Sequence, residues 1–460
     1  MAVDLDIRSI ESSVADEIYI SAKPKSASLR PAATHRGERA QSSRGGLQEQ
    51  ACEIFSGIAD NLRSKNACIL RERIFTPKKP AEELLRLRSQ IYGELDDGVA
   101  ATILVGKPES TGPITAVQVH AICSDSRPEV IDVEGRPAGR ILRVPGCTYL
   151  TLSSISAGQF DKATEQARAM MEKAESALKQ FNSDFFSVAR TWMWLGRILS
   201  WYGSFNRVRN KFFTERGLIP PAATHRGEPA ARLTPGPLDK LGAGSVPEPK
   251  ACPQVAGLKT RGQSMPASTG IGLRPTPHQL YISGGDRKNR GVKPVIRVNW
   301  CGGSKCAMDL IAVLEPRDSI QHLQAAGRQQ CALEYGSAFS RASRAITPAG
   351  ETIFVSGTAS IDASGATTHI DDPLGQIKET IKNVRAVLKD THVTDEDVVQ
   401  AVAYCKTTEV EQIFNDLGSR GAGSLKSTIA WPWVTVICDI CRPELLFEVE
   451  ATALKAAKTR

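Results

Sequence analysis

The sequence has no long hydrophobic run. Across 460 residues, no window reaches the roughly 18 uninterrupted apolar residues that a membrane-spanning helix requires. The N-terminal stretch MAVDLDIRSIESSVADE is acidic, and it lacks the basic region and apolar segment of a signal peptide. We therefore expect a cytoplasmic protein with no membrane partner.

Regular cysteine and histidine spacing is also missing. The 11 cysteines are scattered, which suits reduced thiols in large domains better than a disulfide framework. Cys438 and Cys441 form a CxxC pair, but odd spacing on a strand would point the two thiols to opposite faces. Cys301 and Cys306 have no histidine at ligand spacing. We expect no metal site.

The positive charge comes without the motifs of a nucleic-acid-binding protein. The formal net charge is +8, but much of the excess lies in the Pro- and Gly-containing stretches 23–44 and 250–261, and no groove-reading motif accompanies it. We expect no nucleic-acid partner. A positive balance also suits an enzyme for a small dianionic substrate, which arginine can bind specifically.

Three parts of the chain are too rich in proline, glycine and arginine to form core elements. The string PAATHRGE occurs at 31–38 and again at 221–228, without the fixed period of a solenoid repeat. The second copy opens a Pro-broken run at 220–264, and a further doubtful stretch covers 274–305. We expect poor structure in these two inserts and in the N-terminal segment 1–65.

Three blocks with regular patterning remain. The first, 66–150, contains strand patterns and an expected helix at 81–95. The second contains expected helices at 160–179 and 205–216 around a strand at 185–195. The third repeats this order, and its expected elements are strand 352–356, helix 373–389, strand 398–406, helix 410–417 and strands 433–441 and 445–454.

This order of elements predicts an α+β fold in which mixed sheets carry helices on one face. Because blocks two and three share it, we expect two related modules packed together. The predicted domains are 66–330, interrupted by the inserts at about 220–264 and 274–305, and 331–460.

One carboxylate stands out near the end of the chain. Glu448 lies between Phe447 and Val449 in an apolar strand, just after the turn Arg442-Pro443. Desolvation there would raise its pKa and let it hold a proton near neutral pH, as a general acid must. A strand-end glutamate that faces solvent is the alternative. Glu450 lies on the same strand face and is the second candidate.

Several motifs now carry a family resemblance. The third block resembles the YjgF/RidA-like fold through 355–357 (VSG), the helix with Gln376, Thr380 and Asn383, and 448–451 (EVEA). Over 66–219 and 264–455 the chain resembles the chorismatases, two-domain enzymes on that fold that are often labelled pteridine-dependent deoxygenases. The motifs behind this second resemblance are 190–192 (RTW), 201–206, 266–272 (PASTGIG) and 335–341 (YGSAFSR).

The resemblance implies an activity. Chorismatases cleave the enolpyruvyl ether of chorismate and release pyruvate with either a hydroxybenzoate or a dihydroxycyclohexadiene carboxylate. The resemblance implies a monomer without a cofactor, a small-molecule substrate, and a catalytic domain at 331–460. It also matches Glu448 to the catalytic glutamate of the family.

The two carboxylates of chorismate call for arginine, whose planar fork pairs with a carboxylate. Arg341 is the first candidate, and Arg190 and Arg344 are weaker ones; surface arginines are the alternative. Tyr335 could donate its hydroxyl to the same carboxylate. Ser268 and Thr269, followed by glycine, would let backbone N–H groups approach the ligand, unless they form an ordinary Gly-rich turn.

Two residues bear on the ring product, and they disagree. Cys441 precedes Glu448 by seven residues, where the resemblance places the cysteine of hydroxybenzoate-forming members. Ala359 falls near the position whose size separates the branches, and alanine there resembles the hydrolytic branch. We favour 3-hydroxybenzoate, because a side chain near the ring says more than one methyl group. Cys441 as a small core residue is the alternative.

Two other functions stay open. Imine deamination is the commoner activity of the fold, but those enzymes carry an arginine just after a proline ahead of the penultimate strand, and here Pro432 is followed by Trp433. A non-catalytic small-molecule-binding protein, disabled by the inserts, is the third hypothesis.

Overall fold

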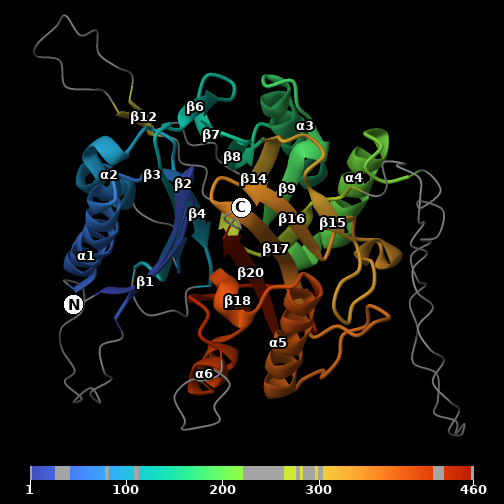
Figure 1. Ribbon diagram of the computed structural model, residues 1–460. Helices are drawn as coiled ribbons and strands as arrows, with labels where there is room; N and C mark the ends of the chain where they lie inside the picture. The colour runs from blue at the N-terminus through green and yellow to red at the C-terminus, as the bar shows by residue number, and fades with distance from the viewer. Residues whose placement is uncertain are drawn as a thin grey trace, which may run out of the picture.

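The computed structural model describes residues 3–25, 42–77, 82–107, 113–220, 264–275, 280–282, 296–298, 304–417 and 429–456. Within these ranges the chain forms three six-stranded sheets, each with both parallel and antiparallel neighbours, and helices that lie outside them (Figure 1). A separate hairpin pairs β12 (Leu280–Ile282) with β13 (Ile296–Val298). The expected α+β class is confirmed.

Module one lies at the N-terminus and comprises residues 3–124. Its elements are β1 (Val3–Glu11), β2 (Ala15–Pro24), α1 (Ser42–Ser64), β3 (Cys68–Thr76), α2 (Glu82–Tyr92), β4 (Thr102–Val105) and β5 (Ala116–Ser124). The short strand β11 (Arg274–Pro275) adds to its sheet beside β4, although it comes from a later part of the chain.

Module two follows and comprises residues 129–315. Its elements are β6 (Glu129–Asp132), β7 (Pro137–Val144), β8 (Cys147–Ser156), α3 (Ala163–Lys179), β9 (Val188–Leu195), α4 (Tyr202–Glu215), β10 (Ala267–Ile271) and β14 (Cys306–Glu315). The expected insert at 220–264 lies between α4 and β10, and its residues 221–263 are outside the described part of the chain.

Module three closes the chain and comprises residues 321–456. Its elements are β15 (Gln321–Leu323), the 3-10 helix η5 (Ala332–Tyr335), β16 (Ala342–Thr347), β17 (Gly350–Ala359), α5 (Pro373–Asp390), β18 (Val398–Cys405), α6 (Thr408–Asp416), β19 (Trp433–Ile437) and β20 (Phe447–Ala456). Helix α5 begins where its sequence predicts, because the Asp372 side chain accepts a hydrogen bond from the Gly375 N–H and Pro373 occupies the first turn.

The three modules share one topology. In each, an antiparallel hairpin pairs through its second strand with the last strand of the module, which then pairs with a middle strand that has a parallel neighbour. The sheet orders are β1-β2-β5-β3-β4, β7-β8-β14-β9-β10 and β16-β17-β20-β18-β19. The repeat therefore has three copies.

The modules pack in a closed ring. The parallel pair of each module faces the hairpin of the next: β3 and β4 meet β7 and β8, β9 and β10 meet β16 and β17, and β18 and β19 meet β2. A shared apolar core fills the space between the sheets, with Phe75, Trp192 and Tyr404 as its large members from the three modules. The helices lie at the periphery, away from this core (Figure 1).

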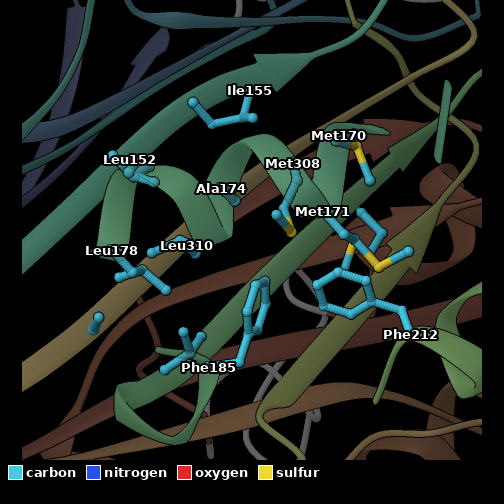
Figure 2. Packing of buried hydrophobic residues seen from close by; sticks show 14 of the residues in the cluster. Leu152, Ile155, Met170, Met171, Ala174, Leu178, Phe185, Phe212, Met308 and Leu310 are labelled. Carbon is cyan, nitrogen blue, oxygen red and sulfur yellow. The ribbon is translucent and has the colours of Figure 1, made fainter. Parts of the chain in front are cut away.

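Each module also has its own core between sheet and helices. In module two, residues of α3 such as Met170 and Leu178 pack against strand residues such as Leu152 and Leu310 (Figure 2). The helical spacing of apolar residues in α3 predicts this buried face. In module one, a separate apolar cluster lies between the sheet and helices α1 and α2, and in module three another lies between the sheet and helices α5 and α6.

Two expectations from the sequence need correction. The N-terminal segment 1–65 is not poorly ordered where it is described, because β1, β2 and α1 form there and bury residues such as Ile20, Phe55 and Leu62. The modules number three and not two, because residues 3–124 form a complete copy. Of the second insert, 274–305, only short strand segments and residues 304–305 are described.

Candidate active site between modules two and three

A pocket lies where modules two and three meet. Module two contributes α4 and β10, and module three contributes η5, the segment between η5 and β16, the end of β17, the turn before β20, and β20 itself. The lining residues are Tyr202, Arg209, Ser268, Gly270, Tyr335, Ser337, Phe339, Arg341, Gly357, Ala359, Ile361, Cys441, Arg442 and Glu448. Six of the residues expected from the sequence, among them Glu448, Cys441 and Arg341, are brought together here.

Glu448 lies on β20, between Ala359 of β17 and Tyr404 of β18. Its side chain faces the pocket while the residue is only 4% exposed, and its carboxyl makes no hydrogen bond with the described residues. Burial, reinforced by the nearby Glu450 carboxylate, raises the pKa of Glu448 to about 8. The carboxyl therefore holds its proton at neutral pH.

The neighbouring strand leaves room for this carboxyl through Gly357. The residues Ser356 and Gly357 form a β-bulge opposite Glu450, where the register of β17 and β20 shifts. A Cβ atom at position 357 would lie 2.1 Å from Oε1 of Glu448. Only glycine fits there without displacing the acid.

Glu450 lies on the same face of β20 but has a different environment. Its carboxylate accepts hydrogen bonds from Arg73 Nη1 at 2.8 Å, Arg190 Nη2 at 2.9 Å and Trp192 Nε1 at 3.0 Å. Burial alone would raise its pKa, but the Arg73 and Arg190 guanidinium groups overcome this and lower it to about 2. Glu450 is therefore ionised beside a protonated Glu448.

Three arginines surround the pocket. Arg209 comes from α4, Arg341 immediately precedes β16, and Arg442 lies in the turn before β20. Arg341 and Arg442 lie 5.4 and 5.3 Å from the ring of Tyr335, which they flank. Arg209 is 1% exposed, and its buried Nε has no hydrogen-bond partner among the described residues. Such a set of cations suits a ligand with more than one carboxylate.

Cys441 and Ala359 form part of an apolar wall with Ile361, Ile440 and Leu445. Burial, and next the Glu448 carboxyl, raise the pKa of the Cys441 thiol, so the sulfur stays neutral at ordinary pH. Ala359 is the direct β17 partner of Glu448. Both residues are therefore close to the acid.

The remaining residues expected from the sequence divide between the pocket and the space behind it. Ser268 lines the pocket, and its buried Oγ has no partner among the described residues, whereas its backbone N–H is already bonded to Ser356 Oγ at 2.8 Å. Thr269 and Arg190 do not line the pocket; they bind each other, and Arg190 binds Glu450. Arg344 points elsewhere and donates to the Thr391 carbonyl.

Sequence reasoning missed several lining residues. Arg442 stands directly after Cys441 in the turn motif, so its position beside the candidate acid was available as a signal. Arg209 and Tyr202 lie in the middle and at the start of α4, where an amphipathic pattern alone does not separate pocket residues from core residues. Arg73, which binds Glu450 behind the pocket, had no signal of any kind, because the sequence of its β3 strand is that of an ordinary core strand.

In modules one and two, the residue at the position of Glu448 is not acidic. A bulge of β8 lies opposite Asp309 as the bulge of β17 lies opposite Glu450, which makes these acids equivalent. The residue two positions earlier is Glu448 in module three but Ala307 in module two. The matching residue before Gln118 of module one is Ala116. A buried acid at the Glu448 position therefore occurs once in the ring.

The described residues contain no group of three His, Cys, Asp or Glu side chains placed to hold a metal ion. Among the described helices, none is long and apolar enough to cross a membrane.

Comparison with known proteins finds a family model that matches most of module three. Residues 334–455 match the family model described as endoribonuclease L-PSP, the family of the YjgF/RidA proteins. No curated protein sequence matches the chain.

Among solved structures, the chain is similar to a crystal structure of chorismatase. The match has 16% identity and a TM-score of 0.50, and it covers 84% of this chain and 93% of that one. At this identity the likeness concerns the fold. Shorter matches include a Rid-family protein of unknown function from Yersinia pestis, at 19% identity and a TM-score of 0.25 over 30% of this chain and 99% of that one. A YjgF/YER057c/UK114-family protein from Mycobacterium tuberculosis matches at 20% identity and a TM-score of 0.23, over 30% of this chain and 100% of that one.

Proposed function

We propose that the chain cleaves the enolpyruvyl ether of chorismate, with Glu448 as the general acid. The observation that carries this proposal is the buried Glu448 carboxyl, which faces a pocket with three arginines, has no hydrogen-bond partner among the described residues, and has its pKa raised by burial. The fold-level likeness to a chorismatase, across most of the length of both chains, supports it.

The chemistry needs one positioned acid. Proton transfer from Glu448 to the methylene carbon of the enol ether gives an oxocarbenium ion, which is open to attack by oxygen. Addition of water followed by cleavage of the C–O bond gives pyruvate and a dihydroxycyclohexadiene carboxylate. In the aromatic branch, pyruvate and a hydroxybenzoate together contain all the atoms of chorismate, so no net water is consumed. A positioned acid contributes about 10²–10⁴ in rate.

The arginines would bind the two carboxylates of the substrate. Arg341 and Arg442 flank Tyr335 on the module three side, whereas Arg209 approaches from module two. One carboxylate could therefore be held by each side of the pocket. The Ser268 hydroxyl, which has no partner among the described residues, is a further donor for the ligand.

We favour 3-hydroxybenzoate as the ring product because Cys441 lies in the pocket beside Glu448. A neutral thiol can contact the ring without competing for the carboxylate sites. Ala359, the marker for the hydrolytic branch, lies in the same wall, so the product must be identified directly.

The fold gives a second reason against imine deamination. Trp433 of β19 packs in the core of module three, against Phe414, and not at the pocket. In module two the equivalent of Trp433 is Ser268, because Thr269 pairs with Trp192 of β9 as Val434 pairs with Val402 of β18. Ser268 faces Glu448, so the arginine of the deaminases is missing from the position that faces the pocket as well.

A pyruvate assay tests the proposal. Purified protein is incubated with chorismate, pyruvate is measured with a coupled dehydrogenase, and the ring product is identified by chromatography. We expect pyruvate from the wild type and none above background from Glu448→Gln, with chorismate binding retained in that variant. A folded wild type that releases no pyruvate would refute the proposal. We also expect a monomer, since the ring of modules closes within one chain.

A further inference from the structure

The two carboxyl groups on one face of β20 differ in their hydrogen bonding within the described part of the chain: Glu450 accepts several hydrogen bonds and Glu448 none. Glu448 and Glu450 are two residues apart on one strand face, and both are at least 95% buried. Among the described residues, all side-chain hydrogen bonds to the pair go to Glu450. Two of the donors are the arginines Arg73 and Arg190, and the Trp192 indole and the Thr269 hydroxyl also donate.

These donors lie outside module three. Arg73 belongs to β3 of module one and lies 377 positions before Glu450 in the sequence; its second nitrogen, Nη2, is held by Gln118 Oε1 at 2.7 Å. Arg190 and Trp192 belong to β9 of module two. None of the three lines the pocket. A clamp from two modules therefore fixes a carboxylate of the third, behind the site.

We propose that Glu448 and Glu450 act as a pair that shares one proton, and that Arg73 and Arg190 keep this proton on Glu448 by binding Glu450 as a carboxylate. Arg73 is then a positioning residue that acts through Glu450. Its effect on proton donation rests on the proposed function, whereas its effect on the location of the proton does not.

The argument starts from the cost of two adjacent buried charges. Two neighbouring carboxylates in a low-dielectric interior cannot both ionise readily, so one of them retains a proton. Charged hydrogen-bond donors stabilise the carboxylate that they contact. Because all these donors contact Glu450, the proton is left on Glu448, the carboxyl that faces the pocket.

The other groups around the pair do not reverse this assignment. Glu448 is near Arg442 and Arg190, which favour its charged form, and near the neutral side chains of Cys438, Cys441 and Tyr202. Glu450 is also near Arg71 and Tyr404. Arg73 acts on Glu450 directly and is not among the charges that shift Glu448, so the two effects can be separated by substitution.

Asp309 provides an internal comparison, because it occupies the position of Glu450 in module two. It accepts hydrogen bonds from Thr102 Oγ1 at 2.9 Å and the Ser154 N–H at 2.7 Å, but none from a described arginine. Burial raises the pKa of Asp309, in contrast to Glu450. At this strand position the carboxyl without an arginine clamp therefore has a raised pKa, and the carboxyl with the clamp has a lowered one.

Infrared difference spectroscopy on the full chain locates the proton, since a protonated carboxyl has a C=O stretch separate from that of a carboxylate. The spectrum of Glu448→Gln is subtracted from that of its parent at neutral pH. The subtraction cancels the absorption of Asp309, which is present in both proteins. In the wild-type background we expect the band of one protonated carboxyl. In the Arg73→Met background we expect this band to be lost or strongly reduced, because the proton then resides on Glu450.

The control variants change another arginine of β3 or replace Arg73 with a second cation. Arg71→Met removes a buried arginine of β3 that lies 3.9 Å from the same Trp192 ring but donates no recorded hydrogen bond to Glu450, and it should leave the difference band intact. Arg73→Lys keeps a cation and should restore the band. If Arg73→Met does not fold, Arg73→Gln gives the same comparison, because it also removes the charge.

An equal difference band in the wild-type and Arg73→Met backgrounds would overturn the inference. Kinetics give a second readout: at neutral pH, Arg73→Met should lower kcat for pyruvate release about tenfold or more, within the range of general-acid catalysis, with KM little changed. If the wild type makes no pyruvate, the proposed function fails, while the infrared comparison still decides where the proton lies.

Discussion

Gly357 and Glu448 fit together only as a pair, because a Cβ atom on residue 357 would lie 2.1 Å from Oε1 of the glutamate. The glycine belongs to the bulge of β17 and the acid to the adjacent strand β20. The same bulge places Ser356 Oγ within hydrogen-bonding distance of the Ser268 N–H of module two. One local irregularity thus makes room for the acid and joins the two modules at the site.

Substitution of this glycine should separate the position of the acid from the stability of the fold. In Gly357→Ala the methyl group displaces the Glu448 carboxyl, and a shift of about 1 Å can cost about 10² in rate. We expect kcat/KM for pyruvate release to fall by about that factor. Gly203→Ala is the matched control, because it adds a methyl group in α4 with only the far end of Arg207 within 4 Å. Near wild-type activity in Gly357→Ala would contradict the assigned geometry.

The raised pKa of Glu448 also predicts a dependence of stability on pH. The ordinary value is 4.5 and the folded value is about 8, so between them the folded chain holds a proton that the unfolded chain releases. This contribution to stability is complete below about pH 4.5 and is lost as the pH rises to about 8.

Glu448→Gln removes this pH-dependent loss of stability, because glutamine does not titrate. Relative to wild type, the free energy of unfolding of the variant should increase with pH across this window, by at most about 1.4 kcal/mol for each pH unit. Urea denaturation at several pH values between the two limits measures the difference. A constant difference between wild type and variant would show that the Glu448 carboxyl titrates normally.

Arg442 should contribute to substrate binding. Its Nη1 donates to the Gly365 carbonyl at 2.8 Å, which holds the guanidinium beside Tyr335 at the pocket. A hydrogen bond to a charged group is worth about 1.5–3 kcal/mol, so Arg442→Met should raise KM about 10- to 100-fold. Arg344→Met is the control, since Arg344 is outside the pocket and donates to Thr391. The same change in KM for both variants would point to a general loss of structure.

Cys441 should affect the ring product more than the cleavage step. In Cys441→Ala the acid and the arginines are retained, so pyruvate release should stay within about tenfold of wild type if the thiol takes no part in protonation. We expect the ratio of 3-hydroxybenzoate to dihydroxycyclohexadiene carboxylate to fall, as measured by chromatography of the products. Cys438→Ala, which changes a buried thiol outside the pocket, should leave the ratio unchanged.

Several elements could be predicted from the chain because their signals are local. The helix expected at 373–389 is α5, since its cap, its proline and its apolar spacing lie within the segment that folds. The N-terminal strands also had a signal that went unused: Val3, Leu5 and Ile7 alternate with polar residues along β1. A basic and Pro-containing stretch beyond β2 concealed this pattern.

Part of the site was equally local. Glu448 could be chosen from its apolar strand context, which is contiguous in sequence, whereas Cys441 and Ala359 were chosen from the resemblance to the chorismatases. Arg341 and Tyr335 came from the motif at 335–341 and from the two carboxylates of the substrate that the same resemblance implies. Arg209 and Arg73 could not be predicted, because an arginine in an amphipathic helix or strand gives no indication of the partner that it will face.

The amino-acid sequence specified the strands, the helices and the acid, since periodicity, capping and apolar neighbours act over a few residues. The packing of the three sheets specified the partners of that acid. Arg73, Arg190 and Glu450 meet because a closed ring brings β3, β9 and β20 to one point, and this proximity has no trace in the spacing of the residues along the chain. The pKa of Glu448 depends on such neighbours, so the protonation state of the candidate acid is a property of the assembled ring.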